Sequence, residues 1–329
     1  MRAGGAAGVG AGTMTGIWPW VAFTAGVLAI LAVDLGLFDR KPHVVTVRAA
    51  LGWTVMWVLL ALGFAGAIFY FRGHHAGAEF LAGYLIEYSL SIDNIFVIVL
   101  IFSYFGIRDE LQHRVLFWGI LGALVMRGAM IAAGTALINR FHWITYVFGA
   151  FLLVTAVRMA RESEASDPGN NPVIRFVRRV LPVCDSYHGS AFFTREPDTR
   201  PGRGGTRWLV TPLFVVLVTI ETMDLVFAVD SIPAVFAVTR DPFIVYTSNV
   251  SAILGLRSLY FLLAGVIDRF RYLRYGLALV LAFVGAKMLL AAWYVIPTVV
   301  SLAVIAMLLA GSVVISLVVS RGPAREAHP

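Results

Sequence analysis

Long apolar stretches, each bounded by short polar or charged segments, fill most of this sequence. A helix of about 20 apolar residues rises 1.5 Å per residue and so spans the roughly 30 Å hydrocarbon core of a bilayer. The pattern therefore predicts an all-α, polytopic membrane helix bundle with about nine transmembrane helices. We place these helices at residues 17–38, 50–71, 80–105, 114–137, 142–160, 209–238, 244–267, 272–294 and 297–319.

Three segments fall outside the predicted helices. Residues 1–16 are rich in Gly and Ala and lack the basic start and cleavage site of a signal peptide, so we expect a disordered tail before a retained helix. Residues 161–208 are rich in Arg, Pro, Gly and Asp and predict a cytoplasmic linker with little fixed structure. Membrane helices then occupy 17–160 and 209–319, and residues 320–329 form a C-terminal tail.

The composition supports a membrane protein. Of the 329 residues, 59% are hydrophobic and only 14% are charged, which excludes an ordinary soluble domain and makes the lipid bilayer the expected partner. The net charge of +7 does not predict a nucleic-acid partner, because the basic residues lie mostly in loops between apolar stretches. The single cysteine, Cys184, excludes an internal disulfide framework and a Cys-rich metal site.

The distribution of basic residues predicts the orientation in the membrane. The loops after the first, third, fifth and seventh helices, with the C-terminal tail, hold 19 Lys and Arg in or beside them, and the opposite side holds four. Because cytoplasmic loops carry the excess of Lys and Arg, we expect the N-terminus outside and the C-terminus in the cytoplasm, with the chain in the inner (plasma) membrane.

Three short motifs recur in the same order in the two halves of the chain. The matching segments, with offsets of 137, 133 and 136 residues, are 87–94 with 224–231, 120–127 with 253–257, and 149–153 with 285–289. The third and sixth helices run through the membrane in opposite directions, so the pattern predicts an inverted 3+3 repeat of helices 3–5 and 6–8. Such repeats place a substrate site near the bilayer midplane.

Five acidic residues lie inside these apolar stretches, and each costs about 2.5–3.5 kcal/mol at the centre of a membrane helix. They are Glu87, Asp93, Glu221, Asp224 and Asp230. Three basic residues share the predicted helices: Arg127, Arg257 and Lys287. The acids exceed the bases by two charges, which one divalent cation or two protons would neutralise. Structural ion pairs with the three bases are the alternative interpretation.

Helical spacing predicts which polar residues of the third helix share a face. At 100° per residue, Ser91 and Asn94 lie within about 40° of Glu87, whereas Asp93 is displaced by about 120°. An unbroken helix would thus separate the two acids, so we expect either local unwinding or a second partner for Asp93.

In the sixth helix the same spacing places Glu221 and Ser231 on the face of Asp224 and displaces Asp230. Pro233 lacks an N–H group, so we expect a kink there and a free carbonyl at Val229.

Carboxylates, an amide, hydroxyls and carbonyls form an all-oxygen donor set, which suits Mg²⁺, Ca²⁺ or Mn²⁺. All seven histidines lie in loops, in tails or at helix edges, which argues against a zinc or copper site in the bundle. The candidate metal ligands are Glu87, Ser91, Asp93, Asn94, Glu221, Asp224, Asp230 and Ser231.

The chain resembles the TerC/Alx family, which is related to the LysE transporter superfamily. The resemblance covers residues 17–319 and rests on Glu87-Tyr-Ser-Leu-Ser-Ile-Asp93-Asn94, on Glu221 through Ala234, on Gly285-Ala-Lys287-Met288, and on Asp34-Leu-Gly-Leu-Phe-Asp-Arg-Lys. It implies efflux of Mn²⁺, with the acids of the two central motifs as metal ligands. It also implies a link to tellurite or alkaline-pH stress resistance. Arg158 departs from the pattern, where the family has Lys.

Our first hypothesis is a secondary transporter that exports Mn²⁺ by alternating access in exchange for protons, since carboxylates that lose a metal in a low dielectric take up protons. No cofactor and no enzymatic activity are expected. One alternative is a membrane scaffold of a stress-resistance complex. Another is an intramembrane aspartyl protease, but the sequence contains no Gly-x-Gly-Asp motif. The oxygen donors alone do not separate Mn²⁺ from Ca²⁺ or Mg²⁺.

Overall fold

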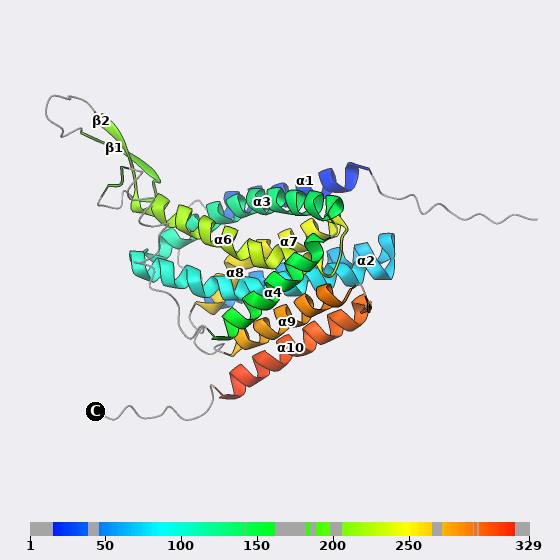
Figure 1. Cartoon of the computed structure of the whole chain (residues 1–329). Coiled ribbons are helices and arrows are strands. Elements are labelled where there is room, and N and C mark those ends of the chain that lie inside the picture. The colour runs from blue at the N-terminus through cyan, green and yellow to red at the C-terminus, as the bar shows by residue number, and fades with distance from the viewer. Residues whose placement is uncertain are drawn as a thin grey trace, which may run out of the picture. The chain divides into compact units, whose positions relative to one another are not determined.

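The computed structural model is mostly helical and carries one two-stranded sheet (Figure 1). It describes residues 16–38, 46–141, 143–161, 182–184, 189–197, 206–264, 272–291, 293–294 and 296–319. The predicted C-terminal tail and all but the last residue of the predicted N-terminal tail lie outside this set, as does most of the predicted linker.

The chain divides into two compact units, residues 1–42 and 43–329. The first unit contains one helix, α1 (Trp18–Phe38), which agrees with the helix predicted at 17–38. The side chain of Asp34, part of the motif in this helix, lies outside the described residues.

The second unit contains the remaining helices. They are α2 (Val47–Phe105), α3 (Asp109–Arg140), α4 (Ile144–Arg161), α6 (Pro212–Phe236), α7 (Pro242–Leu254), α8 (Leu256–Leu263), α9 (Leu273–Leu290) and α10 (Thr298–Val319). In the described part of the chain, six helices are long and apolar enough to cross a membrane: α2, α3, α4, α6, α9 and α10. The all-α membrane bundle is thus confirmed, and the number of nine crossings stays a prediction.

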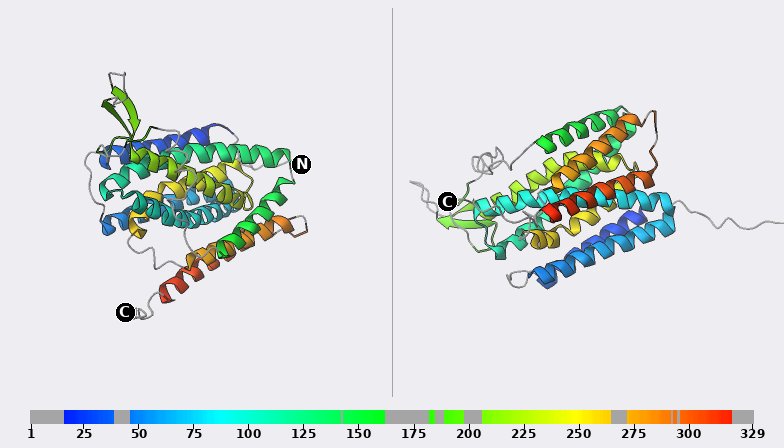
Figure 2. Two further views of the ribbon diagram at one scale, coloured as in Figure 1. Left: turned by 60° about the vertical axis from the view of Figure 1, so that its left-hand side comes forward. Right: turned by 90° about the horizontal axis from the view of Figure 1, so that it is seen from below.

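The predicted helices at 50–71 and 80–105 join into the single element α2, which turns back on itself at Gly73. This glycine has φ 88° and ψ 171°, a backbone conformation that other residues rarely adopt. The two limbs pack against each other, and the rings of Phe64 and Phe80 lie 5.4 Å apart. The right-hand view of Figure 2 shows the limbs side by side. Each limb is longer than the roughly 20 residues that one crossing needs.

The predicted helix at 244–267 is divided in two, since α7 ends at Leu254 and α8 begins at Leu256. Gly255 separates them, and glycine is the weakest helix former after proline. Residues 265–267 of the prediction lie outside the described set. By contrast, α6 continues as a helix through Pro233 to Phe236, so the proline does not end it.

The predicted linker contains a short hairpin that its composition did not indicate. Strands β1 (Phe193–Pro197) and β2 (Thr206–Val210) pair antiparallel, with Phe193 opposite Val210. The sixth predicted helix, placed at 209–238, therefore begins later, at Pro212. Thr211 ties the hairpin to the helix, because its hydroxyl donates to the carbonyl oxygen of Ala191 at 2.8 Å.

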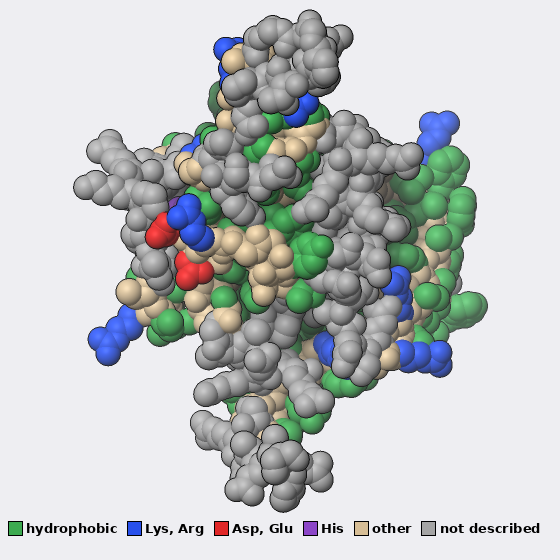
Figure 3. Space-filling view, turned by 90° about the vertical axis from the view of Figure 1, so that its left-hand side faces the viewer, with side chains coloured by type: hydrophobic (Ala, Val, Ile, Leu, Met, Phe, Trp, Pro, Cys, Tyr) green, Lys and Arg blue, Asp and Glu red, His purple; other side chains and the backbone are tan. Residues whose placement is uncertain are grey.

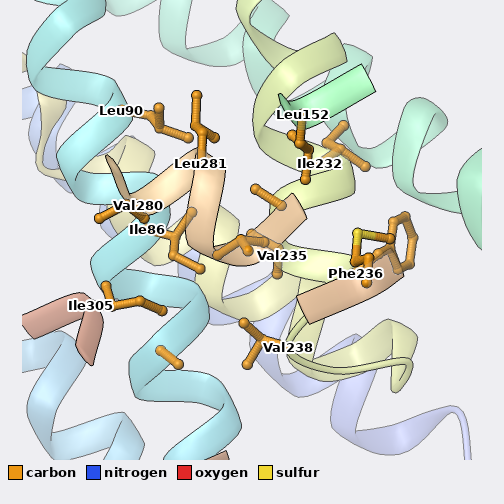
Figure 4. Packing of buried hydrophobic residues seen from close by; sticks show 14 of the residues in the cluster. Ile86, Leu90, Leu152, Ile232, Val235, Phe236, Val238, Val280, Leu281 and Ile305 are labelled. Carbon is orange, nitrogen blue, oxygen red and sulfur yellow. The ribbon is translucent and has the colours of Figure 1, made fainter. Parts of the chain in front are cut away.

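The main hydrophobic core lies where α2, α4, α6, α9 and α10 meet. Figure 4 shows its side chains pointing toward one another from these helices: Ile86 and Leu90, Leu152, Ile232 and Val235, Val280 and Leu281, and Ile305. Helix α4 packs along α9, and α9 along α10, while α3 packs on α6 and α2 packs on α7 and α8 (Figure 2).

Two glycines from the predicted repeat allow α4 and α9 to approach closely. A Cβ atom on Gly285 would lie 2.8 Å from the carbonyl oxygen of Gly149, and one on Gly149 would lie 3.0 Å from the carbonyl oxygen of Gly285. Their backbones are thus in direct contact, which a side chain on either residue would prevent.

Candidate cation-binding site

Arg127 of α3 is the centre of the polar cluster inside the bundle. Its side chain is 1% exposed, and its guanidinium binds carboxylates from two other helices. Its Nη2 donates to Asp224 Oδ1 at 2.7 Å and its Nε donates to Oδ2 at 3.0 Å, which is the two-pronged geometry that arginine forms with carboxylates. Its Nη1 donates to Glu87 of α2. The acidic motifs of α2 and α6 therefore meet at one arginine.

Asn249 of α7 completes this cluster, although the sequence analysis did not single it out. Its amide Nδ2 donates to Glu87 Oε2 at 2.8 Å, so both oxygens of this fully buried carboxylate are engaged. Ser231 Oγ lies 3.4 Å from Arg127 Nη1. A signal for Asn249 was available, because the polar run from Thr247 to Asn249 interrupts an apolar stretch.

A cavity adjoins the cluster and is bounded by α2, α3, α6, α7 and α8. It is a narrow, partly open cavity of about 30 Å³. Its polar lining includes Asn94, Glu221, Asp224 and Arg257. Asp224 therefore belongs both to the arginine cluster and to the cavity wall. Glu221 Oε2 is buried and has no hydrogen-bond partner among the residues that the structure describes.

The other predicted ligands are placed differently. Asp230 does not line this cavity, and its Oδ1 accepts a hydrogen bond from Thr155 of α4 at 3.1 Å. Ser91 is buried, and its hydroxyl has no partner within the described ranges. The side chain of Asp93 lies outside the described residues.

The helical spacing within α6 is confirmed by these contacts. Asp224 and Ser231 both reach Arg127, and Glu221 and Asp224 both line the cavity, whereas Asp230 points to another helix. The eight predicted ligands thus do not form a single metal coordination shell. Six of them are divided between the arginine cluster (Glu87, Asp224 and Ser231), the cavity (Asn94, Glu221 and again Asp224) and the α4–α6 contact (Asp230). Across the side chains that the structure describes, no three His, Cys, Asp or Glu residues form a group that could hold one metal ion.

Lys287 of α9 contacts a serine and none of the five predicted acids in the described part of the chain. The sequence analysis had counted it among the three bases that balance those acids. Its Nζ donates to Ser301 Oγ of α10 at 2.9 Å. A further acid that the sequence analysis did not name, Glu79 of α2, accepts from Thr239 at 2.9 Å and pairs with His75 at 3.3 Å. These residues lie near the end of the bundle where α2 turns back.

Similar proteins place the chain in a family. Residues 72–324 match the integral membrane protein TerC family. An uncharacterized membrane protein of Myxococcus xanthus is 50% identical over 303 residues, which cover 92% of each chain. A protein of Escherichia coli K12 named "Putative membrane-bound redox modulator Alx" is 47% identical over 296 residues, 87% of this chain and 90% of that protein.

A protein of the same name from Photorhabdus laumondii is 44% identical over 317 residues, 93% of this chain and 97% of that protein. No solved structure matches the chain. The buried acids at Arg127 lie within the matched region, as do α3, α6, α7 and the part of α2 that carries Glu87. The chain belongs to the integral membrane protein TerC family.

Proposed function

We propose that this protein is a secondary transporter that exports a divalent metal cation, and that the cation occupies the cavity beside Arg127. The observation that supports this proposal is the carboxylate of Glu221, which presents a buried oxygen without a protein partner among the described residues. Asp224 and the amide of Asn94 line the same cavity. Oxygen donors of this kind suit hard divalent cations, and the family resemblance favours Mn²⁺.

Arg127 has a defined part in this proposal. It neutralises Glu87 and Asp224 when no cation is present, so the acids do not stand uncompensated in a low dielectric. A cation that binds Asp224 from the cavity competes with the guanidinium for the same oxygens. That competition weakens cation binding, and a transporter needs its cargo to leave.

Flux measurements in proteoliposomes test the proposal. Glu221→Gln and Asp224→Asn each remove a charge from the cavity and are expected to abolish most Mn²⁺ flux. Glu110→Gln, in the first turn of α3 and exposed, is the matched control and keeps the wild-type rate. Wild-type flux no greater than that of empty liposomes, or full flux in both cavity variants, would refute it. Competition by Ca²⁺ and Mg²⁺ identifies the cargo, and an imposed pH gradient tests proton exchange.

The proposal includes nine crossings of the inner membrane with the N-terminus outside. Arg161 at the end of α4 and Arg195 and Arg207 in the hairpin belong to the predicted cytoplasmic side, and Arg72 and Arg140 to the other. Figure 3 shows the end that carries the hairpin, where Lys and Arg side chains are visible and hydrophobic side chains cover the flank at the right. Reporter fusions at residues 73 and 200 should report opposite sides.

The inverted repeat also belongs to the proposal. The packing of α2 on α7 and of α3 on α6 is the reciprocal arrangement that two related halves produce. The mutual contact of Gly149 and Gly285, which are 136 residues apart, supports the same relation. A two-fold arrangement of this kind would place the cavity between the halves.

The names of the relatives raise a second possibility, a redox modulator. A thiol–disulfide relay within one chain needs two cysteines, and this chain has one. The variants Glu221→Gln and Asp224→Asn also distinguish a transporter from a scaffold of a stress complex. A scaffold would still protect cells against tellurite or alkaline pH when it carries either substitution. Transport predicts that both variants lose this protection.

A further inference from the structure

Gly122 of α3 lies so close to the carboxylate of Glu221 that a side chain at position 122 would displace that carboxylate. A Cβ atom at this position would lie 2.5 Å from Glu221 Cδ and 2.6 Å from Oε2, and Cβ atoms in proteins do not approach other heavy atoms within 3.0 Å. One turn earlier on the same face, a Cβ on Gly119 would lie 3.9 Å from Glu221 Oε1, an ordinary contact. The carboxylate therefore occupies the space that Gly122 leaves.

Hydrogen bonds do not account for the position of the Oε2 atom. It is buried and has no partner in the described part of the chain. Arg127, the nearest guanidinium on α3 in sequence, donates instead to Asp224 and Glu87. The position of Oε2 thus depends on packing, and Gly122 provides space that a Cβ atom would otherwise take from this carboxylate.

We infer that Gly122 is a positioning residue that sets where the Glu221 carboxylate stands in the cavity and thereby sets the affinity for the transported cation. This inference rests on the proposed transport function. Mg²⁺ demands ligand distances of about 2.0–2.1 Å and Ca²⁺ about 2.3–2.6 Å, so a shift of an oxygen by roughly 1 Å removes it from either coordination shell. A methyl group at position 122 forces a shift of this size.

The test combines three variants of the full chain in proteoliposomes, with initial Mn²⁺ flux measured against Mn²⁺ concentration. Gly122→Ala is expected to raise the KM for Mn²⁺ about tenfold or more, because misplacement by about 1 Å is enough for such losses. The control is Gly128→Ala in the same helix, whose Cβ would meet Tyr246 at an ordinary 3.5 Å. It should keep the wild-type KM.

Rescue separates positioning from general damage to the fold. Glu221→Asp withdraws the carboxylate from α3 by one carbon–carbon bond, about 1.5 Å. In the background of Glu221→Asp, alanine at position 122 should therefore cause no further rise, and the double variant Gly122→Ala/Glu221→Asp should have a KM close to that of Glu221→Asp alone. If alanine at 122 raises the KM by the same factor whether residue 221 is Glu or Asp, the positioning role is refuted.

A second measurement does not depend on transport. A hydrophobic carbodiimide modifies carboxyl groups inside membranes, and peptide mass spectrometry gives its rate at Glu221. Gly122→Ala should change this rate at least twofold and Gly128→Ala should not. An unchanged rate together with an unchanged KM overturns the inference. If wild-type flux equals that of empty liposomes, the transport proposal fails, and the modification rate alone decides the role of Gly122.

Discussion

Replacing Arg127 by Met removes the positive charge that Glu87 and Asp224 share. The side chain is 1% exposed and makes three charged hydrogen bonds, two to Asp224 and one to Glu87. Methionine fills a similar length without a donor. The substitution leaves two carboxylates facing each other inside the bundle, with Asn249 as the remaining donor to Glu87.

The cost follows from these contacts. At about 1.5 kcal/mol for each hydrogen bond to a charged group, three bonds give about 4.5 kcal/mol. This value lies within the roughly 3–5 kcal/mol expected when one partner of a buried ion pair is removed. Arg127→Lys keeps the charge but loses the two-pronged contact with Asp224, so we expect about 3 kcal/mol, on the basis of two lost bonds.

Unfolding of the purified protein in detergent measures this cost, and a cycle of variants isolates its cause. Arg127→Met alone and Glu87→Gln/Asp224→Asn together should each be destabilised, because each leaves buried charge without its partner. The triple variant removes the whole charged group and should recover most of the lost stability. A triple variant no more stable than Arg127→Met, or an Arg127→Met protein as stable as the wild type, would show that ionic pairing does not hold α2, α3 and α6 together.

Two further pairs of substitutions test the end of the bundle where α2 turns back. Gly77→Ala would place a Cβ within 3.0 Å of three atoms of the Phe69 ring and should destabilise the protein by about 1–3 kcal/mol. Gly66→Ala, with nothing within 4 Å, should not destabilise it in the same unfolding assay, because alanine is the better helix former. Asp241→Ala removes the cap that accepts from the first backbone N–H groups of α7 and should cost about 0.5–2 kcal/mol. Arg72→Ala removes a partly exposed ion pair with Asp241 and a cation–π contact with the ring of Phe243, and should cost about 1 kcal/mol, less than Asp241→Ala. An equal loss for both would contradict the capping role.

Much of the helical framework could be predicted from the sequence, because the length of an apolar stretch alone identifies a membrane helix. The helices at 114–137, 142–160 and 297–319 are present as α3, α4 and α10 within a few residues, apart from an N-terminal extension of α3. The hairpin at 193–210 could not be predicted in this way, since strands of five residues in a polar segment carry no strong periodic signal.

The arrangement of the acids was predictable only within one helix. Spacing of 100° per residue correctly separated Asp230 from Asp224. It could not show that Arg127 binds Glu87 and Asp224 together, because that depends on how α3 is rotated against two other helices. Nor could spacing show that Lys287 contacts Ser301, a residue of a helix outside the predicted repeat.

The shared pairing of Arg127 also bears on how the chain enters the bilayer during synthesis. Arg127 follows Glu87 by 40 residues and precedes Asp224 by 97. At roughly 5–20 residues per second, the ribosome needs about 5–20 s to extend from the arginine to the second acid. Glu87 is inserted first, Arg127 neutralises it next, and Asp224 arrives last. At every stage the nascent protein leaves at most one of these three charges uncompensated in lipid, so the order of the residues along the chain itself eases insertion.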